Sequence, residues 1–242
     1  MRFIVAKDKN QLGDMAGEAI LSLVKSKPNA VLGLATGSSP LELYARLAKG
    51  CREGVSFKRV VSFNLDEYID CPIEKETYRA FMEVNLFSKI DIDRENTHFP
   101  DAGNPSSYDD LIASSGKIDL QVLGIGRNGH IGFNEPGTPR DSLTHIIPLT
   151  QSTREANARF FRGDIDLVPT EAVSMGLATI MKAKKIVLVA NDASKAEAIA
   201  CLLRNEDTLA VPASVLEKHP DCDVYLTEDL YEDAKKLNAG RL

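Results

Sequence analysis

The sequence lacks the features that mark secreted, membrane-spanning and nucleic-acid-binding proteins. Its four cysteines form no close pair, which favours reduced thiols over a disulfide framework, and the absence of tryptophan carries no functional message. No apolar run approaches the roughly 20 residues of a membrane-spanning helix. The first residues, Met1–Val5, are typical of a strand and not of a signal peptide. With a net charge of -6 and no basic stripe, we expect a cytoplasmic protein that binds neither membranes nor nucleic acids.

What the sequence does contain is a regular alternation of strand and helix patterns. Strands are expected at Arg2–Ala6, Leu120–Leu123, His145–Leu149, Lys185–Ala190 and Val224–Thr227, and at the apolar runs that begin at Val31 and Val60. Helices are expected at Lys9–Ser26, Thr77–Leu86, Tyr108–Ser115, Thr153–Phe161, Ser194–Leu203 and Glu228–Leu237, and from Pro40 onward.

This alternation predicts an α/β fold with three αβα layers. We expect a mostly parallel, Rossmann-like sheet that has helices on both faces and right-handed crossovers. The 242 residues suit a single domain over 1–242, although the length alone also allows two small domains.

The segment with the most chemical content is the glycine-rich loop 124–137, which follows the apolar strand Leu120–Leu123. Its five glycines let the backbone bend tightly and approach a ligand closely. His130 and Glu135 in this loop can both transfer protons near neutral pH. Because open α/β sheets place their chemistry at the carboxyl ends of strands, the loop is a candidate active-site loop. The alternative is a turn that only closes a connection and contains a structural histidine.

A second strand end, Val31–Leu41, is a candidate anion site. Its apolar strand leads into Thr-Gly-Ser-Ser, and Pro40 then opens an amphipathic helix with a serine or threonine placed to cap it. Free backbone N–H groups at a helix N-terminus favour phosphate. This segment lacks the Gly-Lys-Ser/Thr ending of a Walker loop and the Gly-x-Gly-x-x-Gly pattern, so a phosphorylated small molecule is favoured over a nucleotide. An ordinary capped helix is the alternative.

A third strand end carries two adjacent carboxylates, Asp66 and Glu67. Such a pair can bind a metal, transfer protons or cap a helix, and a metal site would need further ligands nearby. Only Asp70, Glu74 and Glu76 follow, and they are typical of a solvated loop. A general base is therefore favoured and no metal site is expected. The three strand ends together supply phosphate-binding, base and acid/base groups.

Four segments together resemble the glucosamine-6-phosphate deaminase family in their order and spacing. They are residues 34–40, 63–68, 124–136 and 156–161, and the string Asn-Gly-His-Ile-Gly-Phe-Asn-Glu-Pro in the third is highly specific. The likeness covers nearly the whole chain. It implies that an amino sugar phosphate and water are converted to fructose 6-phosphate and ammonia, with no cofactor and no metal.

The resemblance also implies roles for the acidic and histidine side chains. Asp66 would be the base that moves a proton between carbons two and one, and Glu67 would support it. His130 would give and take the ring-oxygen proton, with Glu135 tuning or orienting it, and Gly126 would support the loop.

The phosphate group would be bound by two cations and by one loop. By resemblance these are Arg159 and Lys195, with N–H and hydroxyl donors from Thr36, Gly37 and Ser38. Lys195 is also singled out on physical grounds, because a cation in the first turn of a helix opposes the helix dipole unless an anion binds there. Without the resemblance, Arg159 would be interpreted as a surface ion pair.

Two departures from the family pattern affect these expectations. Asn128, expected among the catalytic residues, stands where many members have aspartate, so Glu135 would be the sole acid coupled to His130. The segment His145–Pro148 is nearly apolar, whereas regulated members carry basic residues there. We therefore expect no activation by N-acetylglucosamine 6-phosphate, and a monomer or small homo-oligomer.

Related functions remain open at this point. A 6-phosphogluconolactonase shares the general fold and a Gly-His loop, but its loop typically continues toward Leu-Phe-Pro, whereas this chain has Asn134-Glu135-Pro136. A galactosamine-6-phosphate deaminase or a sugar-phosphate isomerase would use nearly the same side chains. A sugar-phosphate sensor is a further alternative, but it would not need Asp66, His130 and Glu135 together.

Overall fold

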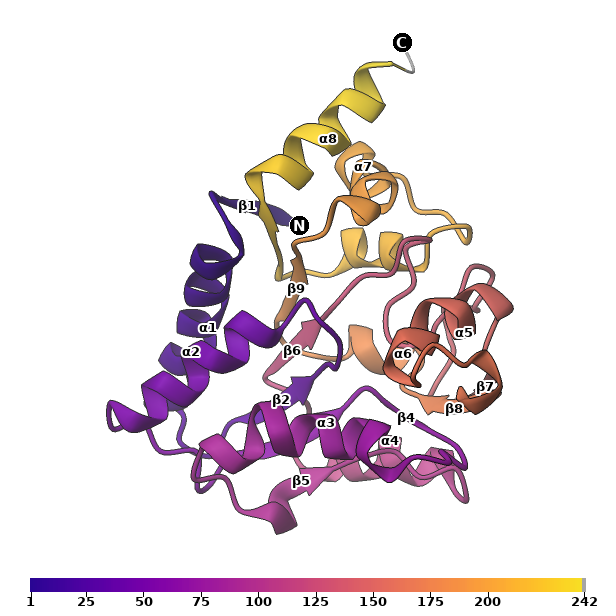
Figure 1. The fold of residues 1–242 in the computed structure, drawn as a ribbon. Helices are drawn as coiled ribbons and strands as arrows, with labels where there is room; N and C mark the ends of the chain where they lie inside the picture. Colours follow the sequence, from indigo (N-terminus) through magenta and orange to yellow (C-terminus); the bar gives the residue numbers. More distant parts are fainter. Residues whose placement is uncertain (241–242) are drawn as a thin grey trace.

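The computed structural model, which describes residues 1–240, is built on a seven-stranded sheet in which every strand pair is parallel (Figure 1). In spatial order the strands are β1 (Arg2–Ala6), β10 (Cys222–Thr227), β9 (Ile186–Ala190), β6 (Leu120–Leu123), β2 (Val31–Leu34), β3 (Val61–Asn64) and β5 (Thr97–His98). The expected α/β fold with a mostly parallel sheet is confirmed.

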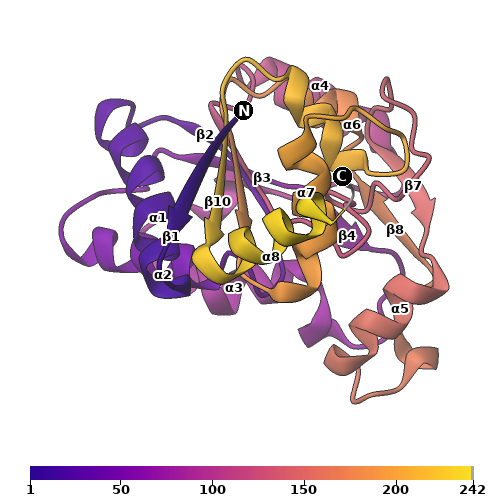
Figure 2. The same cartoon turned by 90° about the horizontal axis from the view of Figure 1, so that it is seen from above.

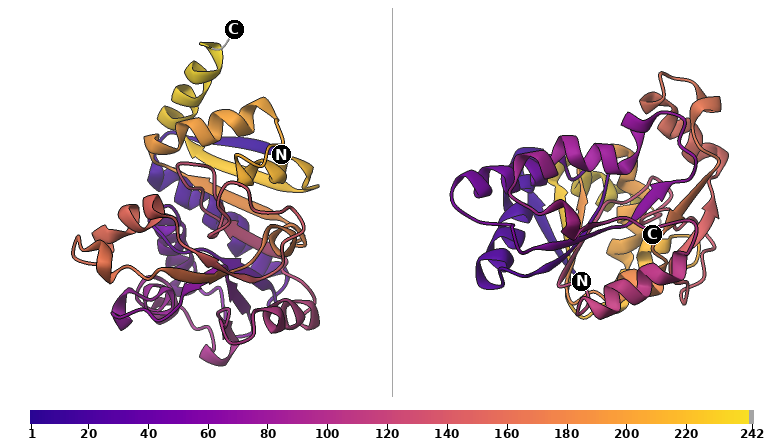
Figure 3. Two further views of the ribbon diagram at one scale, coloured as in Figure 1. Left: turned by 90° about the vertical axis from the view of Figure 1, so that its right-hand side faces the viewer. Right: turned by 90° about the horizontal axis from the view of Figure 1, so that it is seen from below.

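Helices cover both faces of this sheet. The α-helices of the described residues are α1 (Lys9–Ser26), α2 (Leu41–Arg52), α3 (Tyr78–Asn85), α4 (Pro105–Ser114), α5 (Gln151–Asn157), α6 (Leu177–Met181), α7 (Ala196–Arg204) and α8 (Glu228–Ala239). Helices α1, α2 and α3 lie on one face and α4, α6, α7 and α8 on the other (Figure 2; Figure 3). Within residues 1–240, none of these helices has the length and apolar character needed to cross a membrane.

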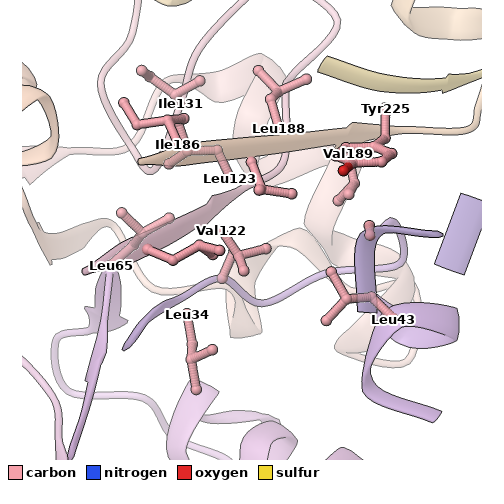
Figure 4. Close-up of a cluster of buried hydrophobic side chains, with 14 of the residues drawn as sticks. Leu34, Leu43, Leu65, Val122, Leu123, Ile131, Ile186, Leu188, Val189 and Tyr225 are labelled. Carbon is pink, nitrogen blue, oxygen red and sulfur yellow. The ribbon is translucent and has the colours of Figure 1, made fainter. Parts of the chain in front are cut away.

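The core lies between the sheet and these helices. All five residues of β9 are buried, and its isoleucine, leucine and valines pack with side chains from the neighbouring strands, from α2 and from the loops that follow the strands (Figure 4). Helix α1 begins where the Asp8 carboxylate accepts the Gln11 N–H, and it buries one apolar face that includes Leu12 and Ile20. Burial of these apolar faces fixes the layers and hence the positions of the strand ends.

A small antiparallel sheet stands beside the large one and was not predicted. It contains β4 (Asp66–Tyr68), β8 (Glu171–Ser174) and β7 (His145–Pro148), in that order. Its own apolar cluster includes Tyr68, Phe133 and Phe161. The sheet joins the strand end that carries Asp66 to a segment more than 100 residues later in the chain, because Asp66 pairs with Ser174.

Several element boundaries differ from the expectations. The helix expected at 153–161 is α5 followed by the 3-10 turn η4 (Ala158–Phe160), and the helix expected from Ser194 begins with the 3-10 turn η6 (Ala193–Lys195). In η6 the Asp192 carboxylate accepts the Ser194 N–H at 2.8 Å, which closes a tight turn before α7.

The start of α2 also differs from the prediction. Pro40 lies at the N-cap of α2 and not within its first turn, and no side chain caps this helix, so the predicted serine or threonine cap is wrong.

Four neighbouring strands, β9, β6, β2 and β3, bring their carboxyl ends together. After β2 the chain crosses toward β3, whereas after β6 it leads toward β9 on the other side. The direction of winding therefore reverses between β2 and β6, and open α/β sheets bind ligands at such a point.

Candidate active site

The loop after β6 is held in one conformation by backbone contacts and by one buried asparagine. The Gly126 N–H donates to the His130 carbonyl at 2.9 Å, and the Asn134 Nδ2 donates to the carbonyls of Ile131 and Met175, each at 2.8 Å. A Cβ at Gly126 would lie 2.2 Å from the His130 ring, so only glycine leaves room for the imidazole. Residues 124–129 match the glycine spacing of a dinucleotide-binding loop, but no helix follows them.

His130 and Glu135 are connected through Asn128. The Asn128 Oδ1 lies 2.8 Å from the His130 Nδ1, and the Asn128 Nδ2 donates to the Glu135 Oε2 at 2.6 Å. The direct distance from His130 Nδ1 to Glu135 Oε1 is 3.7 Å. Glu135 is therefore coupled to His130 mainly through the amide and not by direct contact. Asn128, which stands where many family members have aspartate, therefore still connects His130 to Glu135.

This geometry determines which imidazole nitrogen carries the proton. A carboxylate oxygen only accepts, so the contact with Glu135 orients the Asn128 amide and turns its oxygen toward His130. The Nδ1 of His130 must then donate, which leaves Nε2 as the free acceptor. Burial lowers the pKa of His130, Glu135 acts in the opposite direction, and Lys195 lowers it further. The imidazole is therefore neutral at pH 7.

Asp66 is a buried carboxyl group at the start of β4. Its side chain lines the same cavity as His130 and is 6% exposed. Burial, with a smaller contribution from the charge of Glu67, raises the pKa of Asp66 to about 8. A carboxyl group with this pKa can hold or release a proton near neutral pH.

Glu67 points away from Asp66 and supports α3. Its carboxylate accepts the backbone N–H groups of Tyr68, Tyr78 and Arg79 at 2.8 to 2.9 Å, the last two at the start of α3. Helix N-termini favour a negative charge, so this contact fixes the helix beside the cavity. The adjacent carboxylates thus have different surroundings, one in the cavity and one at a helix end.

The cations expected at the site lie at one part of the cavity, together with a third that the sequence did not single out. Arg159 in η4, Lys195 at the N-cap of α7 and Arg127 in the loop after β6 all line it. Burial lowers the pKa of Lys195, and the positive charges of Arg127 and Arg159 lower it further, against the opposite effect of Asp192. The signal that could have found Arg127 is its place three residues before His130.

The two aromatic residues that follow Arg159, Phe160 and Phe161, differ in their packing. Phe161 is fully buried in the apolar cluster of the small sheet, whereas Phe160 is 42% exposed and its ring stacks against the Arg159 guanidinium at 4.7 Å. Only Phe161 therefore packs this segment against the small sheet. Phe160 lies on the cavity wall and orients the arginine.

The loop after β2 completes the cavity. Thr36, Gly37 and Ser38 line it, and Gly37 has a φ of +106°, a conformation that favours glycine. The cavity has a volume of about 890 Å³ and brings together all of the predicted site residues except Glu67 and Glu135. Glu135 lies behind Asn128. No group of three or more histidine, cysteine, aspartate or glutamate side chains in residues 1–240 is arranged to hold a metal ion.

Comparisons with known proteins identify relatives over nearly the whole chain. Residues 7–225 match the family described as glucosamine-6-phosphate isomerases/6-phosphogluconolactonase. The chain is 47% identical to the glucosamine-6-phosphate deaminase of Mycoplasma mycoides subsp. mycoides SC, over 99% of this chain and 100% of the relative. It is 46% identical to that of Shouchella clausii, over 95% of this chain and 96% of the relative.

Solved structures agree with this relationship. The structure of a monomeric glucosamine-6-phosphate deaminase matches with a TM-score of 0.92 and 38% identity, over 96% of this chain and 99% of that one. A 6-phosphogluconolactonase from Thermotoga maritima matches at 19% identity with a TM-score of 0.71, over 93% of this chain and 98% of that one, which shows a shared fold alone. The chain belongs to the glucosamine-6-phosphate isomerase/6-phosphogluconolactonase family.

Proposed function

We propose that this protein is an aldose–ketose isomerising deaminase of amino sugar catabolism, converting glucosamine 6-phosphate and water to fructose 6-phosphate and ammonia. The observation that carries the proposal is the pairing, in one cavity, of the buried Asp66 carboxyl group with the neutral His130. The similarity to deaminases over nearly their full length supports the same reaction. The reaction has no redox step, so it requires no nicotinamide.

The cation cluster suits the phosphate group of this substrate. Arg127, Arg159 and Lys195 supply three positive charges, and the carboxylate of Asp192 supplies one negative charge, so the cluster has an excess of two positive charges. A phosphate monoester approaches a charge of -2 at pH 7 because its second pKa is about 6. The backbone N–H groups and hydroxyls of residues 36–38 add neutral donors.

In the proposed reaction His130 opens the sugar ring. Its Nε2 is free to take the proton of the hydroxyl on carbon one and to return a proton to the ring oxygen. Asn128 keeps the imidazole in this tautomer through the Nδ1 contact of 2.8 Å. Ring opening produces the aldehyde that acidifies the hydrogen on carbon two.

In the proposed reaction Asp66 moves that hydrogen. As a carboxylate it removes the proton from carbon two, and as a carboxylic acid it delivers the proton to carbon one. The C2–H bond breaks and the aldehyde oxygen takes a proton from the ammonium group on carbon two, which gives an enolamine. A C1–H bond then forms, and carbon two becomes an iminium ion that water hydrolyses to a ketone and ammonium, the protonated form of ammonia. A pKa of about 8 suits a group that must both accept and donate the same proton.

The setting of this reaction is part of the proposal. The partner is a small amino sugar phosphate and not a nucleic acid or a membrane. The compartment is the cytoplasm, since a charged sugar phosphate does not cross a lipid bilayer unaided. The free thiols of Cys51, Cys71 and Cys222 suit a reducing compartment. The assembly is a monomer or small homo-oligomer, supported by the similarity to a structure described as monomeric.

The first test is ammonia release from glucosamine 6-phosphate and, separately, from galactosamine 6-phosphate, by protein treated with EDTA. We expect ammonia from the first sugar, little from the second, and the same rate before and after EDTA. Ammonia from neither sugar would refute the deaminase. A rate lost with EDTA and restored by a divalent cation would refute the metal-free mechanism.

Asp66→Asn is the matched variant for the proton transfer. It keeps the shape of the side chain but removes the base, so ammonia release should fall by at least about 10²-fold. Binding of glucosamine 6-phosphate, measured by calorimetry, should change little. Wild-type turnover in this variant would remove Asp66 from the mechanism.

A further inference from the structure

Glu135 is held by more than Asn128. This carboxyl group is 6% exposed, and the Thr153 hydroxyl in α5 donates a short hydrogen bond to its Oε1, while Asn128 donates to its Oε2. Thr150 makes a weaker contact at 3.5 Å and also accepts the Thr153 N–H at the start of α5. Each oxygen of Glu135 thus has one short contact with a neutral donor.

The charges around Glu135 do not replace these donors. In residues 1–240 its one contact with an ionisable side chain is that with His130, at 3.7 Å, and His130 is neutral at pH 7. Lys195 acts on His130 and forms no ion pair with Glu135 within the same residues. A buried carboxylate without a paired cation depends on hydrogen-bond donors, so loss of one donor is costly.

We propose that Thr153 is a positioning residue for ring opening, which rests on the proposed function. Its hydroxyl holds Glu135 as an oriented carboxylate. That carboxylate orients the Asn128 amide, whose oxygen in turn holds the proton of His130 on Nδ1. Thr153 acts through Glu135 and performs no proton transfer of its own. The required feature is the hydroxyl group, not the size of the side chain.

Thr153→Val tests this directly, because valine keeps the branched shape and removes the donor. We expect kcat for glucosamine 6-phosphate to fall by about 10- to 100-fold, the range for a hydrogen bond to a charged group. The KM for glucosamine 6-phosphate should change little, because the Thr153 hydroxyl contacts Glu135 and not the cation cluster. Competitive inhibition by inorganic phosphate should be unchanged. Thr153→Ser, which restores the donor, should recover most of the activity.

Thr179→Val is the matched structural control. Thr179 is also buried and donates a short hydrogen bond to a carboxylate, that of Asp109, but it does not line the main cavity. Its loss should reduce thermal stability to a similar extent while leaving kcat unchanged. Equal effects of the two valine variants on kcat would show that Thr153 has a structural role only, and would overturn the proposal.

A double variant separates the remaining outcomes. In a Glu135→Gln background, Thr153→Val should cause little further loss of kcat if it acts through Glu135. A full additional loss would overturn the proposal, as would wild-type kcat in Thr153→Val. If Thr153→Val fails to fold, Thr153→Ser decides, since activity below one tenth of wild type would be incompatible with a role for the hydroxyl. An inactive wild-type protein would instead refute the proposed function.

Discussion

At the scale of single residues, the charge at the end of the cavity proposed to bind phosphate is the feature with the clearest consequence. Three cations line this end, and none of them forms a salt bridge within residues 1–240. Burial lowers the pKa of Lys195, repulsion by the like charges of Arg127 and Arg159 lowers it further, and the charge of Asp192 offsets this only in part. A bound dianion would remove this repulsion, so each cation should contribute to substrate binding.

Arg127→Ala should therefore raise KM for glucosamine 6-phosphate by about tenfold, because one charge-assisted contact to phosphate is lost. The value of kcat should change little, and Arg127→Lys should restore part of the binding. Arg59→Ala, at the opposite end of the sheet, removes the same charge elsewhere and serves as the control. Equal KM values for the two alanine variants would place Arg127 outside the phosphate site. Steady-state kinetics of ammonia release provide the measurement.

The sequence could not identify Arg127 or Thr153 for physical reasons. Arg127 lies in a loop whose path depends on contacts such as that between Gly126 and His130. Thr153 is eighteen residues from Glu135, and a pattern along the chain does not report which threonine meets a carboxylate. By contrast, His130 was evident from the sequence, because it stands in a glycine-rich loop directly after an apolar strand.

At the scale of elements, α3 and the strand end before it form one unit through Glu67. The Glu67 carboxylate accepts N–H groups at the start of α3, and the Thr77 hydroxyl accepts that of Ala80. Residues of α3 such as Phe81 line the cavity. The charge of Glu67 also raises the pKa of Asp66. Glu67 therefore affects both α3, which forms part of the cavity wall, and the pKa of Asp66 inside the cavity.

Glu67→Gln should have two separate effects. An amide keeps only one acceptor oxygen, so the start of α3 should lose about 1–2 kcal/mol, measured by thermal unfolding. Removal of the negative charge should lower the pKa of Asp66, so the acid limb of the rate profile should move to lower pH. A profile that stays in place, or moves to higher pH, would contradict this electrostatic effect. Asp70→Asn, a nearby exposed carboxylate, is the control.

The elements themselves were predictable where the hydrophobic pattern was long. Helix α1 and strand β9 match the expectation within one residue, because each buries an apolar face or an apolar run against the core. The small sheet was missed although its strand β7 was expected, because its pairings join segments far apart in the chain, which no local pattern reports. The 3-10 turns η4 and η6 were interpreted as helix, since side-chain spacing barely separates the two at this length.

At the scale of the whole molecule, Asp66 makes stability depend on pH. Its folded-state pKa of about 8 lies above the ordinary value of 3.8 that applies to the unfolded chain. The folded protein therefore binds this proton more tightly, and stability is lost as the pH rises from about 4 to about 8. Burying this carboxyl group thus lowers the stability of the fold at neutral pH.

Asp66→Asn should accordingly stabilise the protein at pH 8, by on the order of a few kcal/mol, and should have little effect near pH 4. Each ~1 kcal/mol corresponds to about 2–4 °C in Tm for a chain of this size. Thermal unfolding of both proteins across this pH range is the measurement. A lower Tm for the variant at pH 8 would be the contrary result.

We also propose that residues 1–242 form one domain, for which a single unfolding transition is expected.

We also propose that the protein is not activated by N-acetylglucosamine 6-phosphate. Regulated members of the family carry basic residues in the segment that matches His145–Pro148, whereas in this chain the segment is nearly apolar. Strand β7, at the edge of the small sheet, is His145–Pro148, and Ile146 on it is 42% exposed. We expect hyperbolic kinetics that do not change when N-acetylglucosamine 6-phosphate is added, and sedimentation as a monomer or small oligomer. A sigmoidal rate curve made hyperbolic by that sugar would contradict this.

The sequence by itself determined the alternation of strands and helices, and it pointed to the strand ends that carry Asp66, His130 and Glu135 as the candidate site. These follow from local patterns, because burial and turn formation depend on neighbouring residues. Only the tertiary structure decided that Asn128 bridges His130 and Glu135, and that Asp66 is buried while Glu67 supports α3. Contacts between distant segments set the distances and the loss of solvent that tune each group, and no local pattern contains them.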